Sequence, residues 1–271
     1  MSHWTLEQIP WSSFDPAKVD PDLVRVVKAA AMVEYNGGDY AAYLCGVFQG
    51  DDNFQAVIRD WAVEEVQHGA ALARWAKLAD PSFDFDACFK RFTDGFKVET
   101  AVTASLRGSR AGELVARCIV ETGTSSYYTA LMEATDEPVL KAICKRIAAD
   151  ELRHYKLFYQ HLDTYLRLDK IGAVKRVRIA LSRITESEDD ELAYAYYAAN
   201  HPDESYERKR FTRAYARRAY RYYQRRHVER AMAMVLKATG LNPTGALNRF
   251  LTRLGYWFLA SRARRLAAAN A

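Results

Sequence analysis

The stretch that decides the fold is AVEEVQH at residues 62–68, because it returns as AADELRH at residues 148–154. Each copy holds an acidic residue, a glutamate, two spacers and a histidine. The glutamate and histidine pairs are Glu65 with His68 and Glu151 with His154. Residues three positions apart project from one face of an α-helix, where both can bind the same metal ion. We therefore expect two helices that each present such a pair.

A lone glutamate precedes each copy at a nearly equal interval, Glu34 before the first and Glu121 before the second. Apolar residues recur at three- and four-residue spacing around both, which predicts helices there too. Four such helices supply four carboxylates and two imidazoles, the donor set of ferritin-like di-iron and di-manganese bundles. Neutral imidazole suits iron better than magnesium or calcium, so we expect two Fe ions, with Mn as the alternative for one or both. A single Glu-x-x-His would more often be a solvated surface pair, but two copies with matching glutamates favour a metal site.

The rest of the chain is also typical of helices, because only 13 glycines and 7 prolines interrupt it and no alternating β-branched run occurs. We predict an all-α fold with helices over residues 21–47, 54–78, 87–106, 111–132, 138–166, 173–184, 189–199, 204–238 and 243–268. Gly37 and Gly38 each weaken the first of these by about 1 kcal/mol relative to alanine, so a loosened turn is expected there.

Composition and charge describe a globular chain with two unlike parts. Of its 271 residues 49% are hydrophobic and 27% charged, which excludes a disordered or fibrous protein. Residues 1–160 carry 17 Lys+Arg against 23 Asp+Glu, whereas residues 161–271 carry 22 against 11. We expect a bundle over 1–168 and a basic, Tyr/Arg-rich helical extension over 169–271. Neither a signal peptide nor a spanning helix is predicted, so a cytoplasmic location is expected. The four cysteines fit no metal or disulfide spacing, which predicts reduced thiols.

Two stretches resemble the soluble acyl-carrier-protein desaturases, a branch of the ferritin-like di-iron superfamily. WAVEEVQHG at 61–69 is similar to that family's W-x-x-E-E-x-x-H-G, and residues 143–154 are similar to its I-C-x-x-I-A-A-D-E-x-R-H. The resemblance covers roughly residues 20–166 and implies a ferritin-like four-helix bundle with a crossing helix near residues 89–104. It implies iron ligands at Glu34, Glu65, His68, Glu121, Glu151 and His154.

The resemblance also implies a catalytic role for Thr124, whose hydroxyl would deliver protons during oxygen activation. A threonine that only packs or caps is the alternative. From their positions, Glu64 and Asp150 are candidates to accept the imidazole N–H of the histidine on the opposite helix, with plain surface positions as the alternative.

The activity that these observations favour is that of an O₂-dependent di-iron oxidoreductase. A desaturase or hydroxylase of this type acts on an acyl thioester or another apolar substrate, receives electrons from an acidic, ferredoxin-like donor, and uses acyl carrier protein as a further partner. The resemblance also suggests a homodimer. A ferritin- or rubrerythrin-like protein for iron oxidation or peroxide scavenging stays open as the alternative, although rubredoxin-type cysteine pairs are absent from the sequence.

A basic segment stands between residues 204 and 230, where ten arginines and lysines alternate with tyrosines and phenylalanine. An acidic carrier or electron donor, an anionic membrane face and nucleic acid are the partners that such a surface could bind, and no nucleic-acid recognition motif accompanies it. The alternative is that these arginines pair with the acidic bundle of the same chain. Aromatic and leucine residues over 250–259, beside Arg262, Arg264 and Arg265, suit peripheral contact with the inner membrane face.

Overall fold

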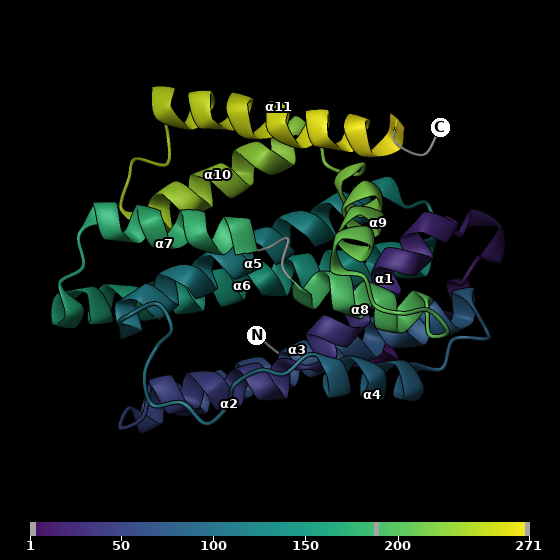
Figure 1. Ribbon diagram of the computed structural model, residues 1–271, viewed down its shortest axis with the longest axis horizontal. Helices are drawn as coiled ribbons and strands as arrows, with labels where there is room; N and C mark the ends of the chain where they lie inside the picture. Colours follow the sequence, from purple (N-terminus) through teal and green to yellow (C-terminus); the bar gives the residue numbers. More distant parts are fainter. Residues whose placement is uncertain (1–3, 187–189, 269–271) are drawn as a thin grey trace. The chain divides into compact units, whose positions relative to one another are not determined.

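The computed structural model describes residues 4–186 and 190–268, and within these ranges the chain is helical without a strand (Figure 1). The predicted all-α class is confirmed. Three short 3₁₀ helices, Leu6–Gln8, Trp11–Ser13 and Pro16–Lys18, come first. The α-helices that follow are α1 (Pro21–Tyr35), α2 (Gly37–Val47), α3 (Asp52–Ala79), α4 (Phe85–Gly95), α5 (Arg110–Ala134), α6 (Pro138–Asp169), α7 (Ala173–Glu186), α8 (Asp190–Asn200), α9 (Arg208–Tyr220), α10 (Arg225–Thr239) and α11 (Ala246–Ala268).

The helices group into two compact units, each built from three separate segments. The first unit consists of Met1–Thr103, Leu131–Arg146 and Glu188–Arg218, and the second of Ala104–Ala130, Ile147–Ser187 and Ala219–Ala271. Helices α5 and α6 contribute residues to both units. The predicted division at residue 168 stays a prediction.

In the first unit α1 is the central helix and packs against α3 and α8. Its alanines and its valines other than Val33 are buried, which lets neighbouring helices approach closely. The start of α6 is fixed by Glu137, whose buried carboxylate accepts hydrogen bonds from the backbone N–H of Leu140 at 2.7 Å and from Trp75 Nε1 at 2.7 Å. One side chain thus caps α6 and ties it to α3.

The first predicted helix is broken at Asn36, so the expected loosened turn is confirmed as the junction of α1 and α2. The predicted helix over 87–106 is wrong beyond Gly95, where α4 ends. A side chain at Gly95 would collide with the hydroxyl of Tyr194 on α8, so α8 packs directly against this end of α4.

The predicted helix over 204–238 is also wrong, because the chain breaks between α9 and α10 at residues 221–224. Gln224 has an extended backbone, and its N–H donates to His227 Nδ1 at 3.0 Å. This contact starts a new helix at Arg225.

In the second unit α10 packs against α7 and α11. Tyr155 of α6 donates to the carbonyl of Met234 on α10 at 2.8 Å. Gly240 ends α10 with a φ of +78°, and a Cβ there would collide with the guanidinium of Arg176 on α7. Within the two described ranges, none of the helices combines the length and apolar character needed to cross a bilayer.

Part of the basic segment pairs with acidic groups of the first unit. Arg218 Nε lies 2.8 Å from Asp22 Oδ1, Arg208 pairs with Asp190 at 3.8 Å, and Arg210 forms an ion pair with Glu204. Of these three pairs, Arg218 with Asp22 joins the basic segment to the acidic bundle as the alternative expects, whereas Asp190 and Glu204 lie in the C-terminal extension itself. All four cysteines are free thiols, as predicted, and burial raises the pKa of Cys118 and Cys144.

Candidate metal centre

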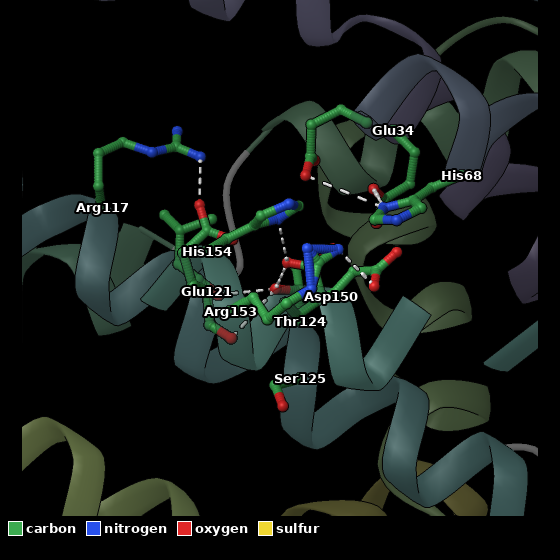
Figure 2. Close-up of polar contacts among 12 residues, drawn as sticks. Glu34, His68, Arg117, Glu121, Thr124, Ser125, Asp150, Arg153 and His154 are labelled. Carbon is green, nitrogen blue, oxygen red and sulfur yellow. Dashed lines mark hydrogen bonds and ion pairs between the residues drawn. The ribbon is translucent and has the colours of Figure 1, made fainter. Parts of the chain in front are cut away.

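One half of the candidate site lies in the first unit, on α1 and α3. Glu34 comes from the last turn of α1, and Glu65 and His68 lie one turn apart on α3. His68 Nδ1 stands 3.5 Å from Glu34 Oε2 and 3.9 Å from Glu65 Oε1 (Figure 2). All three side chains are buried, His68 completely. Two helices therefore bring two carboxylates and an imidazole together inside the protein.

Two glycines permit this approach of α1 to α3. A Cβ on Gly69 would stand 2.5 Å from the backbone nitrogen of Tyr35, and one on Gly37 would stand 2.6 Å from Cβ of Glu65. Both distances are far below ordinary carbon contacts of about 3.5 Å. The glycines thus hold the end of α1 directly over the Glu65 and His68 turn, which places Glu34 within reach of the imidazole.

The other half lies in the second unit, on α5 and α6. His154 Nδ1 stands 3.8 Å from Glu121 Oε2 and 3.8 Å from Glu151 Oε2 (Figure 2). These three residues are at most 3% exposed. Ser125 links the two helices one turn further along, because its hydroxyl donates to the carbonyl of Ala148 at 3.1 Å. The second half therefore repeats the composition and spacing of the first.

The donor atoms of each half fit a shared metal ion. Within each half, one ligand atom from every residue lies within 4.8 Å of the others. Ligand atoms about 2.1 Å from one ion stand about 3 Å apart at right angles and about 4 Å apart on opposite sides. The imidazole–carboxylate separations of 3.5–3.9 Å fall between these limits. Carboxylate and imidazole ligands together suit iron or manganese. Carboxylates that are buried this close together also need a cation to offset the free-energy cost of removing them from water.

Thr124 lies one turn after Glu121 and contacts the second half directly. Its hydroxyl lies 2.7 Å from Glu151 Oε2 and 3.2 Å from the carbonyl of Val120, four residues earlier on α5. The second contact is the ordinary helix-internal bond of a threonine. The first places a proton donor on a predicted ligand, so the geometry is compatible with the predicted catalytic role, which stays a prediction.

Two contacts of the predicted ligands were not anticipated from the sequence. Arg117 donates to Glu121 Oε1 at 3.0 Å, an i,i+4 pair that helix spacing alone could have suggested (Figure 2). Trp4 stacks on His68 with ring centroids 6.0 Å apart and planes 8° apart. Gln67 holds this tryptophan by donating to its carbonyl at 2.8 Å. No local signal could have found Trp4, since it lies far from α3 in the sequence.

The candidate partners of the imidazoles have different surroundings. Asp150 is buried and accepts a hydrogen bond from Arg153 at 2.6 Å, whereas Glu64 is half-buried. For Asp150 a plain surface position is therefore wrong. The predicted bonds of these two carboxylates to a histidine on the opposite helix stay predictions.

Comparison with known proteins adds one finding. Residues 47–186, more than half of the chain, match the family model for fatty acid desaturases. The match contains both Glu-x-x-His pairs, Glu121 and Thr124, while Glu34 precedes it. No curated protein matches the chain.

Proposed function

This chain belongs to the fatty acid desaturase family, and on that premise we propose that it is a non-haem di-iron oxidoreductase. The reaction uses O₂ to remove hydrogen from an unactivated C–H bond of an acyl chain. Glu34, Glu65 and His68 of the first unit would hold metal, and so would the second half of the site. The second half consists of Glu121, Glu151 and His154.

The observation that carries this proposal is the repetition of one arrangement. In both units a buried glutamate of one helix faces a glutamate and a histidine of the next, at imidazole–carboxylate distances of 3.5–3.9 Å. A single buried cluster of this kind could bind many cations, but two equal clusters in a fatty acid desaturase match the donor set of a di-iron centre.

The two irons, when bound, supply the redox chemistry with O₂ that a protein side chain cannot perform. Forming one double bond removes two hydrogens from the acyl chain, and complete reduction of O₂ to two waters then needs two further electrons and two protons. An external electron donor is therefore required. Hydroxylation shares the first hydrogen abstraction and consumes the same electrons and protons, with one oxygen atom retained in the product.

The protein's own side chains position the ligands and manage protons. Thr124 Oγ1 donates to Glu151 Oε2, so its hydroxyl can supply a proton beside the second half of the site. Arg117 fixes the carboxylate of Glu121 and offsets its charge. Trp4 lies parallel to the ring of His68 and helps to fix its orientation.

Thr124 offers a direct test of this proton role. In Thr124→Val the hydroxyl is lost at nearly constant volume, and in Thr124→Ser it is kept. We expect the valine variant to bind iron as wild type does but to form acyl product at least tenfold more slowly, since a positioned proton donor contributes about 10²–10⁴-fold to a rate. A rate close to that of wild type in the valine variant would show that Thr124 only packs.

The proposed electron donor is an acidic, ferredoxin-like protein, and an acidic acyl carrier protein presents the substrate. Exposed arginines of the basic segment support this, among them Arg213 on α9 and Arg230 on α10. Complementary charge accelerates association and makes it dependent on salt. The rate of donor-supported turnover should therefore fall as ionic strength rises.

The proposed function is tested by measuring O₂ consumption and acyl products with iron-loaded full-length protein, a reductant, and acyl thioesters. We expect O₂ uptake to depend on the thioester, and mass spectrometry to detect a product that has lost two hydrogens or gained one oxygen. Glu121→Gln should abolish product, whereas its matched control Glu133→Gln, at an exposed position of the same helix, should not. Uptake that follows added Fe²⁺ and ignores the thioester would instead identify a ferroxidase.

A further inference from the structure

Helix α11 exposes a row of large apolar side chains. Leu247, Phe250, Leu254, Trp257 and Phe258 are 44%, 63%, 51%, 63% and 52% exposed. Their spacing of three and four residues places them along one face of the helix. Large apolar side chains scattered singly are ordinary, but a continuous row on one helix marks a surface that another phase or molecule covers.

The opposite face of α11 already has a partner within the second unit. Asn248 and Thr252 are buried there, and Gly255 faces Val228 and Met232 of α10. One side of the helix therefore packs on α10, and the apolar row faces away from it. Packing within the unit explains the buried side of α11 but does not explain why the exposed side carries large apolar residues.

The charged residues of α11 itself have a single sign. From Arg230 to Ala271 the sequence holds seven arginines and lysines and no aspartate or glutamate. Arg249, Arg253, Arg264 and Arg265 are exposed along α11 itself. An uninterrupted positive surface mixed with apolar side chains selects an anionic occupant. A second copy of the same face would bring arginine against arginine, which opposes self-association through it.

A pocket beside the row gathers three guanidinium groups. Its volume is about 310 Å³, and it is lined by Arg225, Arg253, Tyr256, Trp257, Ala260 and Arg264. Planar guanidinium groups bind phosphate oxygens in pairs, and aromatic walls favour the glycerol and acyl parts of an amphiphile. The pocket thus joins a phosphate-binding end to the apolar row.

We propose that α11 binds the surface of a membrane that contains anionic phospholipids, with the apolar row inserted into the interface and the arginine pocket holding a headgroup phosphate. The exposed phenylalanines and Trp257 have the amphipathic position typical of membrane–water interfaces, and the arginines flank them. The arginines along α11 keep the helix in the interfacial plane. The proposal concerns only the C-terminal helices and does not depend on the metal site or on the reaction.

Vesicle co-sedimentation of the full-length protein tests the proposal. One set of vesicles contains phosphatidylcholine alone, and the other contains phosphatidylcholine and phosphatidylglycerol in equal parts. We expect binding to the second set, weakened by high salt, and little binding to the first. Binding should also shift the fluorescence of Trp257 to the blue, so Trp257→Phe should keep most binding and lose that shift.

Two double variants separate the apolar row from the arginine pocket. Phe250→Ser with Trp257→Ser should abolish binding to both vesicle sets. Arg253→Ala with Arg264→Ala should weaken binding to the anionic set roughly 30-fold, because each arginine near a membrane surface changes affinity by about fivefold. The matched control is Leu106→Ala with Leu168→Ala, which removes exposed apolar side chains away from α11 and should bind as wild type does.

Three results would overturn the proposal. Equal binding to both vesicle sets would show that the arginines give no preference for anionic lipids. If the protein does not bind vesicles but forms a dimer, and the double serine variant is a monomer, this face is an interface between two copies. Absence of vesicle binding together with binding of an acidic protein, lost in the arginine variant, would identify a protein partner. None of these results bears on the acyl-product assay, so failure here leaves the proposed enzyme activity separately testable.

Discussion

Gly69→Ala should loosen the contact between α1 and α3 and with it the first half of the metal site. The added Cβ would stand 2.5 Å from the backbone nitrogen of Tyr35 and 2.7 Å from its Cα and Cβ. Backbone atoms cannot rotate away, so the end of α1 must retreat by about 1 Å to restore ordinary contact. Overpacking of this kind costs about 1–3 kcal/mol, and the better helix propensity of alanine returns up to about 1 kcal/mol. We expect a net loss of about 1–2 kcal/mol.

The matched control for this variant is Gly123→Ala. Gly123 is an exposed glycine in α5, and no neighbouring atom lies within 4 Å of an added Cβ. Helix propensity should therefore stabilise the control by up to about 1 kcal/mol. Urea unfolding followed by far-ultraviolet circular dichroism gives both free energies of unfolding. The Gly69 variant should also bind less iron, because Glu34 moves with the end of α1. A Gly69 variant as stable as wild type would refute the close-packing argument.

Two further stability predictions follow from the first unit. Glu137→Ala removes the cap of α6 and leaves the buried indole N–H of Trp75 without its acceptor, so we expect a loss of about 3 kcal/mol in urea unfolding, and a loss below about 1 kcal/mol would contradict this role. Asp80 has its pKa lowered to about 2, chiefly by the hydrogen bond from buried Lys28 at 2.6 Å. Because its pKa is lower in the folded state, its contribution is complete above about pH 4 and is lost as the pH falls through about 2. Asp80→Asn should cost about 1–2 kcal/mol at neutral pH, after allowance for partial exposure, and the difference from wild type should shrink below pH 4.

The sequence alone was sufficient to predict features that depend on residues close together in the chain. The Glu-x-x-His pairs were predictable because three-residue spacing places both side chains on one helix face. The break at Asn36 was predictable because two glycines follow it, although the close approach to Glu65 that requires Gly37 was not.

The sequence alone was insufficient to predict features that depend on contacts between residues far apart in the chain. Tyr194, from another part of the chain, occupies the space beside Gly95, where α4 ends. The break between α9 and α10 at residues 221–224 is a different case, because its contact is local: the N–H of Gln224 donates to His227 Nδ1, but neither glycine nor proline marks the position in the sequence. Trp4 reaches His68 only through tertiary packing. Pattern and propensity carry no information about such contacts, so they fail at these positions.

The iron content and Mössbauer spectrum of the iron-loaded full-length protein test most directly whether the two halves act as one centre. We predict two irons per chain, magnetically coupled to each other, and loss of that coupled spectrum in both His68→Ala and His154→Ala. A spectrum of isolated mononuclear iron, with each histidine variant losing one iron and leaving the other unchanged, would contradict the account.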